Sequence, residues 1–223
     1  MTDADLFFRI ATFAIPLLFA ITIHEAAHGY VARHFGDMTA ASLGRITLNP
    51  FAHIDLIGTI VLPLLLLVAT DGKFVFGYAK PVPVNFLKLR NPRHDMLLVA
   101  LAGPLSNWVQ ALLWAVVLAV LLKVGIYERF FVVMAAAGVS VNLVLCMLNL
   151  FPLLPLDGGR ILLSLLPHNA ARVFAQLEPY GFIIVIALLF AGVISNYWIT
   201  PLMDLGFKTL QAIIFSPLGL YVF

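Results

Sequence analysis

Long apolar stretches separated by short polar connections make up most of the chain. A helix needs about 20 predominantly apolar residues to cross the hydrocarbon core of a bilayer. The pattern therefore predicts an all-α polytopic membrane protein with about five to six transmembrane segments. The six apolar stretches cover residues 6–31, 56–69, 96–122, 130–150, 181–199 and 202–215.

The connections that follow the first predicted span have an unusual pattern. Residues 56–69 form an apolar stretch that is short for a span, which favours a re-entrant segment. Residues 43–50 and 73–85 carry β-branched and aromatic side chains with Gly and Pro between them, which is typical of strands. Pro81 and Pro83 would confine the second strand to a sheet edge. Such an edge could pair with an unwound peptide, although an ordinary hairpin fits the pattern equally well.

The composition agrees with a membrane protein. The chain has 223 residues, of which 62% are hydrophobic and 11% charged, whereas soluble domains carry about 25% charged residues. The net charge of +2 and the lack of a basic and aromatic patch argue against a nucleic-acid partner. With one cysteine, Cys146, no disulfide can form within the chain. We find no repeat or polar linker, which predicts one membrane-embedded domain over residues 1–223.

The positive charges predict the orientation of the chain in the cell membrane. Cytoplasmic loops are enriched in Lys and Arg, and basic residues lie on both sides of the 56–69 segment. They are Arg33, Arg45, Lys73, Lys80, Lys88, Arg90 and Arg93. Both connections can be cytosolic only if the 56–69 segment enters and leaves on one side. The first and the fourth apolar stretches then both end in the cytosolic half of the membrane.

The sequence HEAAH lies inside the first apolar stretch. His24 and His28 are four residues apart, so a helix projects both imidazoles from one face. Two such histidines can ligate zinc, and Glu25 then lies beside the metal as the base for a water molecule. Ionisable groups inside a membrane segment call for a functional explanation. The alternative is a pair of histidines hydrogen-bonded within the bundle, with Glu25 paired to a base.

A catalytic zinc needs a third protein ligand. His34 stands where an extended HExxHxxGxxH motif has its third histidine, but Val31 replaces the glycine that turns the chain. Asp157 is the better candidate, because it is the one acid at the end of the fourth apolar stretch, in NLFPLLPLDGGR. The prolines and glycines around it predict a helix break, which survives at membrane depth only against protein or a wet cavity. Asp157 could also serve as a helix N-cap.

Several polar residues could support this centre. Asn149 could donate a hydrogen bond to a developing oxyanion, or else bond to a neighbouring helix. Asn107, in AGPLSN, is interpreted as a polar contact that supports the site, and Asn142 shares a helix face with Asn149. The remaining candidates lie at segment edges, where interfacial solvation explains them. They are His53, Asp55, His94 and His168.

The motifs HEAAH, AGPLSN and NLFPLLPLDGG together resemble those of site-2 proteases, which are intramembrane zinc metalloproteases. The resemblance covers most of residues 6–167. It implies that His24, His28 and Asp157 bind one zinc ion, that Glu25 activates water, and that Asn149 assists at the scissile carbonyl. It also implies a β-structured segment over residues 38–50 that dips into the membrane. The chain resembles a minimal form, without room for a PDZ or CBS domain.

The expected function is hydrolysis of peptide bonds in transmembrane segments of other membrane proteins, as in regulated intramembrane proteolysis. The expected partners are a substrate transmembrane helix and the lipid bilayer. Two alternatives stay open at this point. A metal transporter would use the same ligands but needs a continuous polar path through the bundle. A catalytically inactive scaffold would bind membrane partners, but it has no use for a general base beside a metal.

Overall fold

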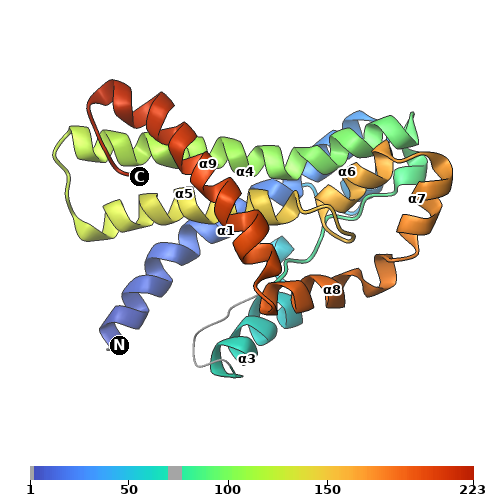
Figure 1. Ribbon diagram of the computed structural model, residues 1–223, viewed down its shortest axis with the longest axis horizontal. Helices are drawn as coiled ribbons and strands as arrows, with labels where there is room; N and C mark the ends of the chain where they lie inside the picture. Colours follow the sequence, from blue (N-terminus) through green and yellow to red (C-terminus); the bar gives the residue numbers. More distant parts are fainter. Residues whose placement is uncertain (1–2, 70–76) are drawn as a thin grey trace.

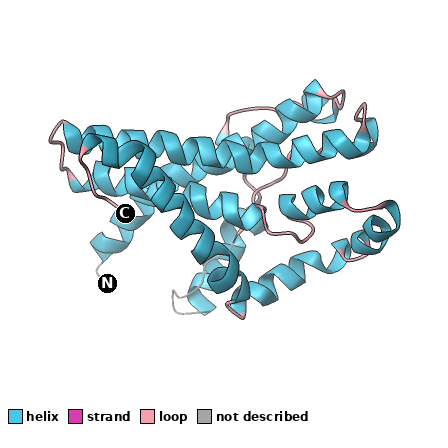
Figure 2. Ribbon diagram, turned by 45° about the horizontal axis from the view of Figure 1, so that its top comes forward, coloured by secondary structure: helices cyan, strands magenta, loops and turns pink. Residues whose placement is uncertain are grey.

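Three long helices form the centre of the molecule. The computed structural model describes residues 3–69 and 77–223. Helices α1 (Asp3–His34), α4 (Pro92–Lys123) and α5 (Arg129–Asn149) pack against one another, and α4 and α5 lie side by side in Figure 1. They correspond to the predicted stretches 6–31, 96–122 and 130–150. The protein is therefore helical, as predicted, and Figure 2 shows helices joined by loops.

Small side chains let the central helices approach closely. Ala111, Ala115 and Ala119 recur every four residues on α4 and are fully or almost fully buried. On the facing helix, Gly138 packs against the Trp114 ring, since a Cβ atom there would lie 2.3 Å from it. Without a hydrophobic driving force between helices in lipid, this close van der Waals packing holds a bundle together.

Shorter elements surround the central helices. Helix α6 (Asp157–Leu165) packs on α4 and continues into α7 (His168–Ala175) and α8 (Glu178–Phe190), which lie at the right in Figure 1. The C-terminal part comprises η4 (Ser195–Ile199), α9 (Thr200–Leu210), η5 (Gln211–Phe215) and η6 (Ser216–Leu218). Between α1 and α4 lie α2 (Thr39–Ser42), η1 (Pro50–His53), η2 (Leu56–Val61), α3 (Leu62–Ala69) and η3 (Phe86–Lys88).

The number of helices able to cross a membrane is lower than the predicted five to six. Among the described residues, three helices are long and apolar enough, or up to four if α7 and α8, bent by 68°, form one span. The predicted stretch 181–199 is not one helix, because α8 ends at Phe190 and Gly192 adopts a left-handed φ of 73°. With 13 residues, α8 is about 20 Å long. This is shorter than the hydrocarbon core of about 30 Å.

The predicted β-structure is not found in the described part of the chain. Within residues 38–50 the backbone forms α2 and local turns, such as Leu43 N–H to Thr39 O at 3.3 Å and Arg45 N–H to Ala40 O at 2.9 Å. Because these backbone groups bond within the segment, they do not pair with a neighbouring strand. Residues 77–85 run without helical structure until η3, but no second strand pairs with them. Residues 73–76 of that predicted strand lie outside the described residues.

Candidate metal centre

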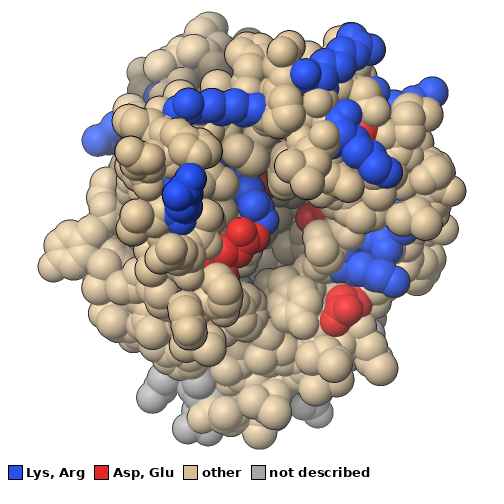
Figure 3. All heavy atoms as spheres, turned by 90° about the vertical axis from the view of Figure 1, so that its right-hand side faces the viewer, with Lys and Arg blue, Asp and Glu red and all other residues tan. Residues whose placement is uncertain are grey.

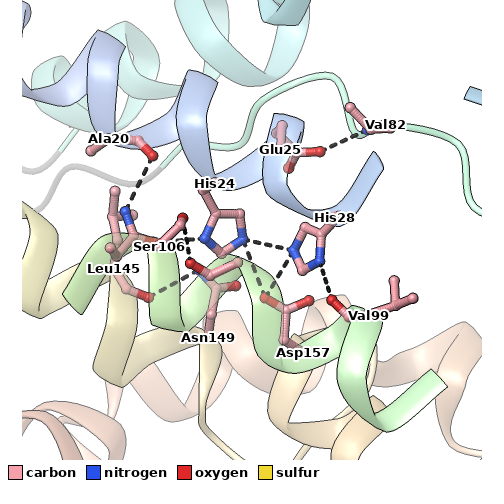
Figure 4. A network of polar contacts seen from close by, with 12 residues as sticks. Ala20, His24, Glu25, His28, Val82, Val99, Ser106, Leu145, Asn149 and Asp157 are labelled. Carbon is pink, nitrogen blue, oxygen red and sulfur yellow. Dashed lines mark hydrogen bonds and ion pairs between the residues drawn. The ribbon is translucent and has the colours of Figure 1, made fainter. Parts of the chain in front are cut away.

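Two histidines and one aspartate meet where α1 faces the start of α6 (Figure 4). The Nε2 atoms of His24 and His28 lie 3.1 Å apart. Asp157 Oδ2 lies 3.2 Å from the first and 3.3 Å from the second. Both histidines are buried, and Asp157 is half-buried. We call these three residues the candidate metal centre.

The outer ring nitrogens of both histidines are held by acceptors on α4. His24 Nδ1 lies 2.6 Å from Asn107 Oδ1, and His28 Nδ1 lies 2.7 Å from the Val99 carbonyl oxygen. The Asn107 amide is oriented by its NH₂ group, which donates to the oxygens of Ala20 and Asn142. Each Nδ1 therefore carries the proton in the neutral ring, and each Nε2 presents a lone pair toward the other and toward Asp157.

The three inward-facing atoms fit a zinc ion. Asp157 Oδ2 is buried without a hydrogen-bond donor, and the two lone pairs of His24 and His28 face it. Three acceptors at such short range repel one another unless a cation lies between them. Zinc bonds of about 2.0–2.2 Å in tetrahedral geometry place ligand atoms roughly 3.3–3.6 Å apart. The observed separations of 3.1–3.3 Å lie at or just below the lower end of this range.

Three residues on one face of α4 lie against the two histidine rings of the candidate metal centre. Val99, Gly103 and Asn107 are four residues apart and so share one helix face. At Gly103, a Cβ atom would lie 2.3 Å from His28 Nε2 and 2.5 Å from His24 Cε1, so only glycine leaves room for both rings. The predicted support by Asn107 is confirmed by its contact with His24. The contact of Val99 with His28 was not predicted, and its helical register relative to Asn107 is the signal that could have found it. Gly103 lies in AGPLSN, whose small residues are typical of close helix approach.

The helix break after α5 brings Asp157 to the histidines. Leu156 is extended and precedes α6, and Asp157 is the first residue of that helix. At Gly158 a Cβ atom would lie 2.2 Å from the Leu150 oxygen, and at Gly159 it would lie 2.3 Å from Leu154 N. The two glycines therefore let α6 begin tightly against the preceding loop. Asp157 makes no N-cap bond, so that alternative is wrong.

A cavity of about 170 Å³ adjoins the centre. His24, Glu25 and Asn149 line it together with apolar residues and backbone, so the predicted base and the predicted oxyanion donor share one space. The remaining lining residues are Ile21, Gly77, Tyr78, Ala79, Leu145, Leu148 and Leu156. Asn149 donates its NH₂ to the Leu145 oxygen at 3.0 Å, which is a bond within its own helix and not the bond to a neighbouring helix that the alternative interpretation predicted. Glu25 Oε2 accepts a hydrogen bond from Val82 N–H at 2.7 Å.

The other candidate residues lie away from the centre. His34 is exposed at the end of α1 and packs on Phe35, which agrees with its rejection as a ligand. The prediction of interfacial solvation is wrong for His53, which is buried with Nε2 3.0 Å from the Thr47 oxygen. Asp55 caps η2, accepting from the N–H groups of residues 57 and 58. His94 and His168 are exposed.

The end of the molecule that faces right in Figure 1 is hollowed at its middle (Figure 3). Acidic side chains lie in and beside this hollow, and lysines and arginines are spread around its rim. Acidic and basic side chains therefore both lie in the hollow, and basic ones surround it.

Comparisons with known proteins agree with the chemistry of the centre. The chain is 38% identical over 216 residues to the "Putative zinc metalloprotease YwhC" of Bacillus subtilis, covering 92% of each chain. It is 30% identical to the "Putative zinc metalloprotease Rip2" of Mycolicibacterium smegmatis, covering 81% of this chain and 67% of the relative. Neither a family model nor a solved structure matches. Identity at this level over almost the whole of both chains means that the chain belongs to the zinc metalloprotease family of YwhC and Rip2, consistent with its resemblance to site-2 proteases.

Proposed function

We propose that this chain is an intramembrane zinc metalloprotease that hydrolyses peptide bonds in transmembrane segments of other membrane proteins. The observation that carries the proposal is the buried cluster of His24, His28 and Asp157, whose lone pairs converge within a helical bundle. Three helices of that bundle are apolar and long enough to cross a bilayer. A hydrolytic centre built among such helices suits a substrate that is itself in the membrane.

His24, His28 and Asp157 would hold one zinc ion per chain. When bound, zinc supplies Lewis-acid chemistry that makes water nucleophilic near neutral pH and polarises a carbonyl group. The chain fixes the ligand set by its hydrogen bonds to the outer ring nitrogens, since these choose the tautomer of each histidine. The buried position of the histidines limits the water that reaches the centre.

Glu25 would move the proton and Asn149 would steady the oxyanion. The carboxylate of Glu25 takes a proton from the attacking water and passes it to the leaving amine as the peptide C–N bond breaks. Asn149 lines the same cavity, and its NH₂ group would exchange its bond to Leu145 for the developing oxyanion. Both residues share this space with His24, so base and donor act on one bound peptide.

A helical substrate must unwind before cleavage, because its carbonyl groups are hydrogen-bonded within the helix. Residues 77–84 form no regular structure and border the cavity through Gly77, Tyr78 and Ala79. The edge of this segment would hold the unwound peptide by backbone pairing. The same site would serve regulated proteolysis, in which cleavage releases part of a membrane protein.

The chain would lie in the cell membrane as a multi-pass protein with its centre toward the cytosolic half. The supporting observation is the concentration of Lys and Arg in the connections between α1 and α4. The predicted re-entrant segment corresponds to η2 and α3, which together are shorter than a span. A substrate helix and the surrounding lipid would be its partners.

Glu25→Gln is the variant that tests this function. We expect cleavage of a tagged single-span membrane protein in proteoliposomes to fall by about 100-fold or more, because the amide cannot take a proton. Zinc content should stay at one ion per chain. Glu128→Gln is the matched control, since Glu128 precedes α5 without a side-chain cap bond. Full activity of Glu25→Gln would contradict the mechanism.

A further inference from the structure

The segment of residues 77–85 approaches α1 with a regular series of backbone donors. Tyr78 N–H donates to the Gly58 oxygen at 3.0 Å, and Lys80 N–H donates to the His53 oxygen at 2.9 Å. Val82 N–H donates at 2.7 Å to Glu25 Oε2. Alternate residues of an extended chain point the same way, so these three donors form one edge. The Val82 N–H differs from the other two donors because its acceptor is the Glu25 side chain, which lines the cavity beside the candidate metal centre.

The two prolines that flank Val82 isolate this donor. Proline has no backbone N–H, so Val82 supplies the one backbone donor in the sequence Pro81–Val82–Pro83. Each proline fixes its own φ near −65°, and a residue that precedes proline is kept out of the helical region. The Val82 N–H is therefore held in direction before any substrate binds.

Side-chain packing fixes Val82 on the same face of α1 that carries Glu25. Val82 is 6% exposed. Gly29 lies one turn after Glu25, and a Cβ atom there would lie 3.1 Å from Val82 Cγ1. The absence of a side chain at Gly29 lets the segment approach this closely. The backbone of Val82 thus reaches the carboxylate while its side chain rests on the next turn.

We propose that the Val82 N–H positions the carboxylate of Glu25 for proton transfer. A glutamate side chain has several rotatable bonds, and a hydrogen bond from an amide to an ionised carboxylate is among the stronger kinds in proteins. With Oε2 held, Oε1 accepts no hydrogen bond from the described residues and is left to take the proton. This inference rests on the proposed function, in which Glu25 is the base.

Val82→Pro removes the donor and keeps an extended backbone between two prolines. We expect kcat to fall by about tenfold to 100-fold, as for other lost bonds to a charged group, with KM and zinc content unchanged. Val82→Ala is the matched comparison, because it shortens the side chain but keeps the N–H, so its kcat should fall by clearly less than that of Val82→Pro. A role in packing alone would lower thermal stability in both variants without this difference in kcat.

A second pair of variants tests whether the donor acts through Glu25. Glu25→Asp withdraws the carboxylate by one methylene group, so it can no longer reach the Val82 N–H and its activity is already reduced. Val82→Pro should then lower kcat by less than about twofold further, since interacting groups give non-additive effects. If Val82→Pro lowers kcat as much in the Glu25→Asp background as in the wild type, the proposal is overturned, because the Val82 N–H would then act on a group other than Glu25.

An ester substitution tests the proposal even if Val82→Pro fails to fold. Replacing the peptide bond before Val82 by an ester, through incorporation of the α-hydroxy acid, changes only the N–H into an oxygen. A kcat within about threefold of the wild type in the ester variant would overturn the proposal. The proposed function is judged separately by Glu25→Gln, whose inactivity does not depend on Val82.

Discussion

At the scale of single residues, the candidate metal centre depends on groups that never touch the metal. Asn107 is fully buried and joins His24 to Ala20 and to Asn142, whose own NH₂ donates to the Gly138 oxygen. These linked amide side chains fix the orientation of the His24 ring through its Nδ1 atom. Residues of this kind tune the affinity for a metal as well as its geometry.

We expect Asn107→Leu to weaken zinc binding by about 10–100-fold, because the His24 Nδ1–H loses its acceptor inside an apolar bundle. Competition with a chelator of known affinity measures the change. Gln110→Leu is the control: Gln110 lies almost one turn further along α4 and makes a single contact of 3.5 Å to Ala20 O. Equal zinc affinity in wild type and Asn107→Leu would show that Asn107 serves packing alone.

Asp37 links the end of α1 to the segment that carries Val82. It is buried, and it accepts hydrogen bonds from the Thr39 hydroxyl at 2.5 Å, Thr39 N–H at 3.0 Å and Asn85 N–H at 2.7 Å. Burial by itself raises the pKa of the Asp37 carboxyl. The hydrogen bonds and the positive charge of Lys88 outweigh burial, so the pKa lies below its ordinary value of 3.8.

A carboxyl group with a lowered pKa in the folded state stabilises that state above the pKa of the unfolded chain. The contribution is present above about pH 4 and is lost as the pH falls through the lower folded value. Asp37→Asn should lower the free energy of unfolding at pH 7 by about 1–3 kcal/mol. Thermal unfolding in detergent should show this difference at pH 7 and a smaller one near pH 3. The exposed Asp204 offers the control variant Asp204→Asn, which should leave the free energy of unfolding at pH 7 within about 0.5 kcal/mol of the wild type.

At the scale of elements, the approach of α1 to α4 sets the space around the histidines. Gly103→Ala should abolish stoichiometric zinc binding, because its methyl group would lie only 2.3 Å from His28 Nε2 and both rings are held by their outer nitrogens. Metal analysis of the purified variant measures this. Leu105→Ala, on the same helix with a 56% exposed side chain, should keep its zinc. One zinc per chain in Gly103→Ala would mean that the helices separate easily.

The sequence predicted elements well where they depend on local pattern. The stretches 6–31, 96–122 and 130–150 match α1, α4 and α5 within a few residues, since long apolar runs can be satisfied only as helices in lipid. The 38–50 segment was predicted to be β-structured on a resemblance, yet a strand needs a partner that local sequence does not specify. Likewise, the left-handed turn at Gly192 divides a stretch that hydropathy alone treats as continuous.

At the scale of the whole molecule, the centre joins residues from α1 and α6 that lie far apart in the sequence, and α4 holds the histidine rings. The pair His24 and His28 could be predicted because their spacing is local, and Asp157 because it is an isolated acid at a helix break. The contacts of Val82 could not, because they depend on how the 77–85 segment packs on α1. Val99 carries no polar side chain, so only its helical register relative to Asn107 points to its contact with His28.

Orientation in the membrane is a property of the whole molecule and can be tested with single cysteines. The native Cys146 is buried and gives a low background. Leu87→Cys places a thiol in η3, where the native side chain is 88% exposed, and Tyr127→Cys places one between α4 and α5, where it is 71% exposed. Helix α4 separates the two positions and is long enough to span the bilayer.

We expect a membrane-impermeant thiol reagent to label Tyr127→Cys in intact spheroplasts, and Leu87→Cys only after the membrane is opened. The physical reason is the group of lysines and arginines in the connections around Leu87, which favours the cytosol. The reverse labelling pattern would move the candidate metal centre to the outer half of the membrane while leaving its ligands unchanged. Labelling of both positions from outside would contradict a membrane-spanning α4, and with it the view that cleavage occurs within the bilayer.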